Sequence, residues 1–371
     1  MMTMRKDMRE PAVQHLIEKI EDACYSDFIM LGHQNAGHIG VSISSHDGTE
    51  SDVKNLTGHH PAVVGIDTLG LTGYEGNMEE LVKTVKQLHR EGVIITLSSH
   101  MPNFSLGGDK FIDYTPNITE GSVGKRIMPG GDLNGKYLEF LGLIADFASK
   151  CIDLSGERIP MIFRPFHEGN GGWFWWGSST LSDRSYKDLF RYTIDVLWDK
   201  GVRNFAYCYS CNGVIASPSE LGTRYPGDDY VDMVGLDFYH DADKPTEQFA
   251  EETLMSLSAI EEFCEEHGKP YAVTEIGRRT LDSLGRGYFE GLAPEGNRDL
   301  TWFTDILRAF EGSEAARRAA YMLFWANFSD TQFWVPYETS SFRHEMCGDF
   351  EKFCEDGFVR LAPGEDGSPK A

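Results

Sequence analysis

The segment from residue 163 to residue 177 combines a carboxyl group with several large aromatic side chains. It reads FRPFHEGNGGWFWWG, in which a glycine-rich step separates Glu168 from Trp173, Trp175 and Trp176. A carboxyl group can deliver a proton to a glycosidic oxygen, and aromatic rings can cover the apolar C–H faces of a pyranose. The alternative, an aromatic core cluster, seldom contains Arg, His and Glu in one short run, because these groups are costly to bury unpaired. The segment therefore predicts a site for sugar chemistry.

Eight short apolar runs rich in β-forming residues divide the chain into repeating units. They cover residues 27–33, 62–69, 92–100, 159–168, 203–210, 231–239, 270–277 and 319–327. Helical patterns fall between most of them, over residues 76–91, 135–152, 182–200, 245–267 and 299–308. Near-continuous hydrophobicity is typical of strands buried on both faces of a parallel sheet. Eight strand–helix units predict an α/β fold, the (β/α)8 TIM barrel.

These units leave little of the chain for a second domain. We expect a single catalytic barrel domain over residues 1–371, with an N-terminal helical extension over 1–26 and a flexible tail over 362–371. The longest insertion, over residues 101–132, is rich in Gly, Pro and Asn and lies between the third strand and its helix. Loops of this length in compact domains are usually functional or mobile.

Polar and aromatic residues stand at the ends of the proposed strands. They are His33, His100, Glu168, Tyr239, Glu275 and Trp325. Active sites of (β/α)8 barrels lie at the C-terminal ends of the strands, so we expect these side chains at one rim. Glu168 and Glu275 would supply the two carboxyl groups that retaining glycosidases hold about 5–5.5 Å apart. The alternative for Glu275 is an ion pair with Arg278 or Arg279 at the rim.

Two motifs resemble those of glycoside hydrolase family 26. They are the RPFHE segment that ends at Glu168, with the tryptophans behind it, and the VTEIG segment around Glu275. The resemblance covers roughly residues 27–335. This family consists mainly of β-1,4-mannanases and is part of clan A, the barrel glycosidases with catalytic glutamates on strands four and seven. The resemblance implies a retaining double displacement with Glu168 as acid/base and Glu275 as nucleophile.

The chemistry of two neighbouring carboxyl groups agrees with these roles. Both cannot ionise easily, so the acid keeps its proton while the nucleophile loses it. Once a glycosyl–enzyme forms, the charge of Glu275 disappears. Glu168 then becomes more acidic and can act as the base that activates water.

The resemblance also implies supporting residues around the nucleophile. Tyr239 matches a tyrosine that hydrogen-bonds the nucleophile, and Asp237 lies on the same face of its strand. Arg164 belongs to the RPFHE motif. His167 stands where most of the clan has Asn and family 26 has His, which favours the narrower assignment.

Aromatic residues and a histidine are expected to line the sugar subsites. His100 and Trp325 match residues at the point of cleavage, and Trp173 matches an aromatic residue on the leaving-group side. The alternative for His100 is a structural histidine at the rim. Trp175 and Trp176 are expected to pack in the core rather than against sugar.

The substrate class that the resemblance implies is β-mannan. We expect an endo-β-1,4-mannanase that acts on mannan, glucomannan, galactomannan or manno-oligosaccharides. Ala326 stands where several family mannanases have an Arg that grips a more distal sugar, so distal binding is expected to differ. A mixed-linkage β-glucanase, a β-xylanase and an exo-acting mannobiohydrolase remain alternatives, because the catalytic pair does not separate them. A non-catalytic carbohydrate-binding barrel is disfavoured because both carboxyl groups are present.

Composition limits the partners and the compartment. A net charge of −24 argues against nucleic-acid binding, and no apolar run approaches the roughly 18 residues of a membrane span. Seven scattered cysteines favour free thiols in a reducing compartment, although Cys208 and Cys211 have the CxxC spacing of zinc or redox sites. The first residues show no signal peptide, so we expect a cytoplasmic monomer, with secretion as the alternative. We expect no metal and no cofactor, and a β-linked polysaccharide or oligosaccharide as substrate.

Overall fold

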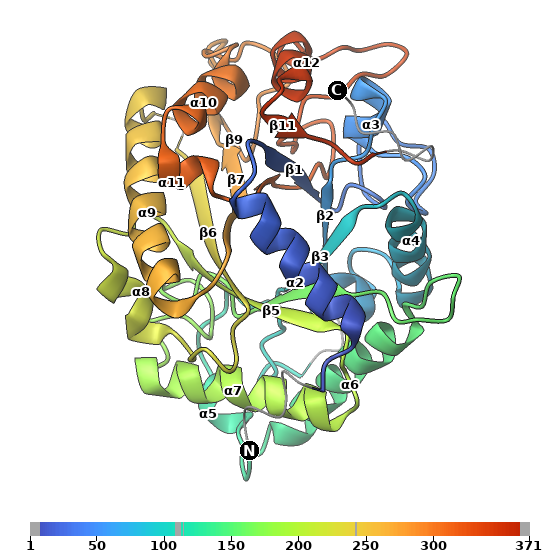
Figure 1. The fold of residues 1–371 in the computed structure, drawn as a ribbon, viewed down its shortest axis with the longest axis vertical. Coiled ribbons are helices and arrows are strands. Elements are labelled where there is room, and N and C mark those ends of the chain that lie inside the picture. The colour runs from blue at the N-terminus through green and yellow to red at the C-terminus, as the bar shows by residue number, and fades with distance from the viewer. Residues whose placement is uncertain (1–7, 108–112, 114, 242, 364–371) are drawn as a thin grey trace.

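The computed structural model describes residues 8–107, 113, 115–241 and 243–363. In this part of the chain, eight parallel strands close into a barrel (Figure 1). The strands are β1 (Ile29–Gln34), β2 (Val63–Asp67), β3 (Ile94–Ser99), β4 (Met161–Pro165), β5 (Phe205–Asn212), β6 (Met233–His240), β7 (Tyr271–Arg278) and β10 (Tyr321–Phe324). Each strand pairs with the next one along the chain, and β10 pairs with β1. The predicted (β/α)8 barrel and its eight strands are therefore confirmed.

Helices cover the outside of the barrel between the strands (Figure 1). The five predicted helices are confirmed as α4 (Met78–Arg90), α6 (Asn134–Lys150), α7 (Asp183–Asp199), α9 (Thr246–His267) and α10 (Trp302–Glu311). Two of them begin at side-chain caps: Asn77 accepts from the backbone of Glu80, and Ser182 from that of Ser185. The buried residues of α7 recur at helical spacing and form the face that packs on the sheet: Tyr186, Leu189, Phe190, Thr193, Ile194 and Leu197.

Shorter elements complete the loops. They are α3 (Asp52–Thr57), the 3-10 helix η1 (Thr68–Thr72), α5 (Val123–Arg126), α8 (Pro218–Arg224), the hairpin of β8 (Thr280–Leu281) and β9 (Tyr288–Phe289), α11 (Glu314–Arg317), α12 (Cys347–Glu355) and β11 (Val359–Arg360). α5 lies in the long insertion, of which residues 108–112 and 114 are outside the described residues. β11 pairs with the start of β1, and so lies at the N-terminal end of the barrel.

One helix, α2 (Pro11–Cys24), crosses the N-terminal end of the barrel (Figure 1). Its buried residues Val13, Leu16 and Ile20 belong to one apolar cluster with residues of the barrel strands, among them Ile94 and Met233. This helix lies within the predicted N-terminal extension. Most of the predicted flexible tail, residues 364–371, lies outside the described residues.

All seven cysteines are buried, and none is in a disulfide bond. Burial raises the pKa of the Cys211 thiol to about 12 and that of Cys208 further still. Within the described ranges, no group of three or more His, Cys, Asp or Glu side chains has a metal-binding arrangement. The same part of the chain contains no helix that is long and apolar enough to cross a bilayer.

Candidate active site

The C-terminal ends of the strands surround a cavity of about 450 Å³. It is lined by five of the six residues expected at the rim, His100, Glu168, Tyr239, Glu275 and Trp325, and also by the predicted site residues His167 and Trp173. Arg164 and Asp237 are buried and contact the lining residues directly. The structure thus brings together the predicted site residues from strands β3, β4, β6, β7 and β10.

His33 is the exception among the residues expected at the rim. Its side chain is fully buried and lines neither this cavity nor a second one, of about 650 Å³, that shares four lining residues with it. Alternate residues of a strand point to opposite faces, and His33 shares its face with Ile29 and Leu31, which pack in the core under the helices. The neighbouring Gln34 instead reaches the rim. The expectation that His33 belongs to the catalytic rim is therefore wrong.

An arginine and a tyrosine hold the carboxyl group of Glu275. Arg164 donates one hydrogen bond to Oε1 of Glu275 and another, of 2.8 Å, to Oδ2 of Asp237. Tyr239 donates from its hydroxyl to Oε2 of Glu275 over 2.7 Å. These groups are all buried, so the carboxyl group of Glu275 is fixed in place by one charged donor and one hydroxyl donor. A carboxyl group that is held by two donors and faces a cavity is positioned to act as a nucleophile.

Asp237 contacts the arginine from β6, the strand beside that of Glu275. Asp237 lies opposite Glu275 in the backbone register of β6 and β7. Its carboxyl group also accepts from the hydroxyl groups of Thr274 (2.6 Å) and Ser210 (2.8 Å). Burial raises the pKa of Asp237 and the charge of Arg164 opposes that rise. The arginine is thereby fixed between two carboxyl groups.

The alternative partners of Glu275 are occupied elsewhere. Arg278 pairs with Asp299 over 2.5 Å. Arg279 pairs with Glu290 (3.2 Å) and Asp241 (3.3 Å). The rim ion pair that was the alternative for Glu275 is therefore not formed.

Glu168 has a different environment from Glu275. Its carboxyl oxygens accept from the indole of Trp173 over 2.8 Å and from the amide of Asn212 over 2.5 Å. Burial, followed by the negative charge of Glu275, raises the pKa of Glu168 to about 8. A carboxyl group that keeps its proton at neutral pH can act as a general acid. Because Trp173 is 43% exposed, its ring can also contact a bound sugar.

The backbone around Glu168 is strained. Both Phe166 and Glu168 have a φ of 53°, in the left-handed region that non-glycine residues rarely adopt. Such residues cost about 1–3 kcal/mol each and persist where the surroundings fix them. Tyr186 donates to the carbonyl of Phe166, and the indole of Trp176 to that of His167, each over 2.8 Å. The tight turn thus aims the carboxyl group of Glu168 into the cavity.

Trp175 and Trp176 pack in the core as expected. They are 1% and 0% exposed, and the indole of Trp175 donates to the carbonyl of Met101 over 3.0 Å. Neither lines the cavity. Of the three tryptophans, Trp173 is the one placed to meet a substrate.

His100 is held by a carboxylate that the sequence did not reveal. Asp67 accepts at Oδ1 from the backbone amides of Leu69 (2.9 Å) and His100 (3.2 Å), and at Oδ2 from the hydroxyl of Ser98 (2.6 Å). Oδ2 also lies 2.8 Å from Nδ1 of His100. Burial opposes the charged imidazole, but Asp67 outweighs it and raises the pKa of His100 to about 9. Nε2 of His100 lies 3.2 Å from Nε2 of His167, and burial together with the His100 charge holds the pKa of His167 well below its usual value.

Asn212 is a second site residue that sequence reasoning missed. It ends β5, which runs two residues beyond the apolar segment that predicted this strand. The available signal was a polar residue at a strand end, as for Glu168. Asp67 gave the same signal at the end of β2.

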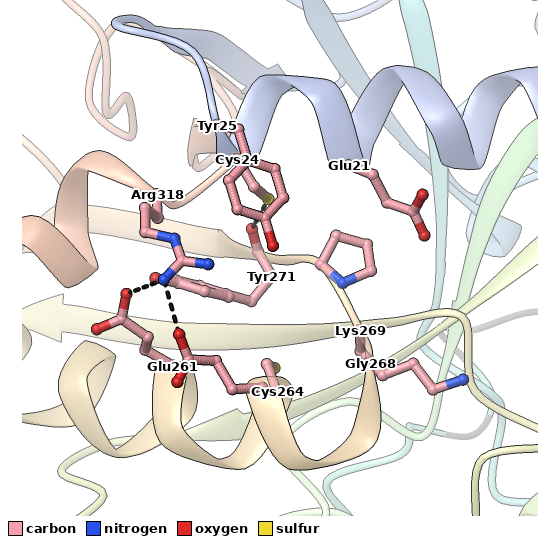
Figure 2. Close-up of a pocket in the computed structure, with 11 residues that line it drawn as sticks. Glu21, Cys24, Tyr25, Glu261, Cys264, Gly268, Lys269, Tyr271 and Arg318 are labelled. Atoms are coloured by element: carbon pink, nitrogen blue, oxygen red, sulfur yellow. Dashed lines mark hydrogen bonds and ion pairs between the residues drawn. The ribbon is translucent and has the colours of Figure 1, made fainter.

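A further pocket, of about 340 Å³, lies at the opposite end of the barrel between α2, α9 and the start of β7 (Figure 2). Four of its charged groups have protein partners: Arg318 donates to Glu261 (2.9 Å) and Glu265 (2.8 Å), and Lys269 donates to two backbone carbonyls. Cys24 and Cys264 line it and are buried. The candidate catalytic groups all lie at the other end.

A (β/α)8 barrel with a hydrogen-bonded carboxyl group after its fourth strand and an arginine-paired carboxylate on its seventh has the architecture of a barrel glycoside hydrolase. Comparison with protein families agrees, because the model of glycosyl hydrolase family 26 matches residues 11–280. The chain belongs to this family.

Its relatives include several mannanases. It is 34% identical over 327 residues to the mannan endo-1,4-beta-mannosidase of Bifidobacterium adolescentis, over 84% of this chain and 31% of that protein. It is 27% identical to the mannan endo-1,4-beta-mannosidase of Bacillus subtilis strain 168, over 66% of this chain and 65% of that protein. The chain thus spans about a third of the first curated relative and just under two thirds of the second.

Solved structures show a closer match in length. The catalytic domain of the Bacillus sp. JAMB-750 GH26 endo-beta-1,4-mannanase is 36% identical, with a TM-score of 0.87 over 97% of this chain and 93% of that chain. The barrel described above is thus the fold of a family 26 catalytic domain.

Proposed function

We propose that this protein is a retaining endo-β-1,4-mannanase that cleaves mannan, glucomannan, galactomannan or manno-oligosaccharides. The observation that carries the proposal is the pair of carboxyl groups with opposite environments in one cavity. Glu275 accepts hydrogen bonds from Arg164 and Tyr239, whereas the pKa of Glu168 is raised to about 8. The names of the relatives support mannan as the substrate.

In the first step, an oxygen of Glu275 attacks the anomeric carbon of the sugar. Glu168 gives its proton to the glycosidic oxygen as that bond breaks, which leaves a covalent glycosyl–enzyme. The esterified Glu275 has lost its charge, so the pKa of Glu168 falls. In the second step, Glu168 takes a proton from water, which attacks the same carbon from the other side and restores Glu275.

The surrounding residues support these two steps. Trp173 donates to Glu168 and exposes its ring on the acid side, where the leaving group would stack. His100 and Trp325 also line the cavity and would contact the sugar at the point of cleavage. Ala326 is fully buried, so this position supplies no side chain to a distal sugar.

Product analysis tests the proposal. The protein is incubated with β-1,4-mannan, mixed-linkage β-glucan and β-xylan, with Glu275→Gln as the control variant. We expect mannan to yield a ladder of oligosaccharides and Glu275→Gln to lower turnover by at least about 10⁴-fold, because the nucleophile is lost while the shape is kept.

Each other outcome rejects a defined part of the proposal. Release of one short product would indicate exo-action, and turnover of glucan or xylan alone would discard mannan as the substrate. Absence of turnover on all three would favour a carbohydrate-binding barrel. Inversion at the anomeric carbon, followed by NMR, would contradict the double displacement.

We also propose that the protein acts as a monomeric single domain in a reducing compartment. The seven free, buried cysteines support this location. Light scattering tests the oligomeric state. A leader sequence upstream in the full gene would contradict a cytoplasmic location and favour secretion.

A further inference from the structure

The segment that follows β10 leaves the barrel and returns to the catalytic cavity. It runs from Asn327, three residues after the strand, to Trp334, which lines the cavity. The backbone amide of Phe328 donates to the carbonyl of Gln332 over 2.9 Å, so the segment turns back on itself. Trp334 is therefore carried on a short loop, and its position depends on the contacts that hold this loop.

The side chain of Asn327 closes the loop. Its Oδ1 accepts from the backbone amides of Trp334 (2.8 Å) and Val335 (3.0 Å), and its Nδ2 donates to the carbonyl of Val335 over 2.9 Å. Nδ2 also donates to Oδ2 of Asp52 over 2.8 Å. Asn327 is fully buried, and these four bonds use both donors and both acceptor positions of its amide group. The amide therefore has one satisfied orientation, which fixes the backbone of Trp334.

Asp52, the first residue of α3, fixes Asn327 in turn. Its carboxyl group accepts from the backbone amides of Val41 (3.0 Å) and Ser42 (2.7 Å), and from the hydroxyl of Ser42 over 2.6 Å. Asp52 is 1% exposed. The carboxyl group is thus tied to the segment after β1, and the loop after β10 is anchored to a neighbouring part of the barrel.

Trp334 packs closely against the backbone of β7. A Cβ atom at Gly277 would lie 2.3 Å from the indole ring, so any side chain at this position would displace the ring. Gly277 lies two residues after Glu275, on the same face of the strand. Tyr239 lies opposite Gly277 in the register of β6 and β7. The glycine therefore leaves room for the indole beside the tyrosine.

The ring of Trp334 contacts the ring of Tyr239. Their centroids are 5.0 Å apart, and the planes are inclined by 57°. The hydroxyl of Tyr239 is the group that donates to Oε2 of Glu275 over 2.7 Å. Trp334 is itself buried, and its indole N–H has no hydrogen-bond partner within the described ranges. The indole is therefore held by packing, and this packing reaches the carboxyl group of Glu275 through the tyrosine.

We propose that Trp334 is a positioning residue that acts on the nucleophile through Tyr239. Its ring keeps the tyrosine in the orientation in which the hydroxyl reaches Glu275, and Asn327 keeps the indole in that place. A small misplacement of a group that orients a reactant can cost about 10²-fold in rate. This inference rests on the proposed function. Because the effect passes through Tyr239, loss of the indole should matter only while the tyrosine hydroxyl is present.

The test is a double-mutant cycle, measured as kcat/KM on β-1,4-mannopentaose. Trp334→Leu, Tyr239→Phe and the double variant are compared with the wild type. Tyr239→Phe removes a hydrogen bond to the reacting carboxylate and should lower kcat/KM about 10- to 150-fold. Trp334→Leu should lower it at least about tenfold. In the Tyr239→Phe background, the same change should have less than about a twofold further effect, because the two residues act as one unit.

Phe333→Leu is the matched control, since it exchanges an aromatic residue for leucine at the neighbouring position of the same loop. Phe333 is fully buried and packs against Tyr337 (centroids 5.0 Å apart) and His344 (5.1 Å). It does not line the catalytic cavity. The control should lower the free energy of unfolding, measured by urea denaturation, and leave kcat/KM within about twofold of the wild-type value.

A second pair of variants tests the anchor while Trp334 is kept. Asn327→Asp places two carboxyl groups against each other, because Asp52 then loses its amide donor. The exchanged pair Asp52→Asn/Asn327→Asp restores one donor and one acceptor at this contact. We expect the single change to lower kcat/KM about tenfold and the exchange to recover part of that loss. No recovery in a folded exchange variant would contradict the role of Asn327.

The other outcomes separate the inference from the proposed function. A loss in Trp334→Leu that persists in full in the Tyr239→Phe background would show that the indole acts on the sugar directly, and would overturn the inference. Equal kinetic losses in Trp334→Leu and Phe333→Leu would assign the loop a structural role and overturn it as well. So would wild-type kinetics in Trp334→Leu, while the mannanase assignment would stand. A wild-type protein that is silent on mannan would instead reject the proposed function, and this inference with it.

Discussion

Strand β6 connects two aspartates whose settings at the two ends of the barrel differ. Asp232, directly before the strand, accepts two hydrogen bonds from Arg9 (2.6 and 2.8 Å) and one from the backbone amide of Tyr207 (2.8 Å). Asp237, five residues later, shares Arg164 with Glu275. Arg9 pairs with a single carboxylate, whereas Arg164 pairs with two. The Arg9–Asp232 pair stabilises the fold, whereas Arg164 holds the carboxyl group of Glu275 at a cavity.

The surroundings of the two pairs differ in the same way. At the N-terminal end, α2 covers the strands with Val13, Leu16 and Ile20 in an apolar cluster. At the C-terminal end, the strained residue Glu168 lines a cavity, and the strained Phe166 lies two residues before it. Strain and buried charge lower stability and are tolerated where they serve a site. The comparison indicates that one end of the barrel contributes stability and the other function.

The largest effect that tests this comparison is expected at the N-terminal end. Asp232→Ala leaves Arg9 without its partner, and removal of one member of a buried ion pair costs about 3–5 kcal/mol. We expect about 3 kcal/mol in the free energy of unfolding, because Arg9 lies before α2 and can turn towards water. Urea denaturation measures the loss, and kcat on mannan should stay at the wild-type value. The double variant Arg9→Met/Asp232→Ala should recover part of the stability; a loss of kcat in a folded Asp232→Ala protein would contradict the division.

The matching substitution at the other end should affect catalysis instead. Asp237→Asn removes the charge that shares Arg164, so the arginine interacts more strongly with Glu275 and makes it a poorer nucleophile. A charged hydrogen bond contributes about 1.5–3 kcal/mol, so kcat/KM should fall about 10- to 150-fold. Steady-state kinetics on mannan measures this loss, with Asp232→Asn as the matched control. Equal kinetic losses in the two variants would remove the distinction between the ends.

The barrel could be predicted because parallel strands buried on both faces give unbroken apolar runs. The short elements could not, since α3 and the β8–β9 hairpin are too brief for a periodic pattern. Strand β5 was predicted to end at residue 210, but it runs on to Asn212, where the sequence becomes polar. His33 was assigned to the rim from its place at the end of a run. The run gave no information on which face of the strand each residue occupies.

The candidate site was predictable where a single motif carried the information. Glu168 and Glu275 stood at strand ends and in motifs that resemble a known family. The roles of Asp67 and Asn212 were not predicted because they depend on contacts between separate strands and loops. A lone aspartate or asparagine at the end of an apolar run is too common to identify a partner. These contacts join residues that are far apart in the sequence, so they become visible only in the folded barrel.

The pH dependence of activity tests the assignment of the acid at the functional end. Because the pKa of Glu168 is raised to about 8, the group is protonated at neutral pH and loses its proton as the pH rises through that value. We expect kcat/KM on mannan to be sustained below pH 8 and to fall about tenfold per pH unit well above it. In Glu168→Ala, this alkaline decline should disappear, while an aryl mannoside with a good leaving group should retain part of its turnover. An unchanged alkaline decline in that variant would assign the ionisation to another group.

The smallest expected effect concerns Asp67 and His100. Oδ1 of Asp67 accepts from two backbone amides, so in Asp67→Asn the amide oxygen should stay there and the NH₂ group should face Nδ1 of His100. His100 then loses its acceptor, shifts its proton to Nε2 and becomes neutral. We expect its pKa, now about 9, to fall below 7, and kcat/KM to drop about tenfold, roughly the value of one charged hydrogen bond. Titration of the imidazole nitrogens by NMR measures the pKa; Ser98→Ala, which keeps Asp67 ionised, should leave it high. Since Asp232→Asn exchanges the same groups at the other end of the barrel, it should not change the titration of His100. A low pKa of His100 with unaltered kinetics would show that its charge is dispensable and that Asp67, like Asp232, serves only the fold.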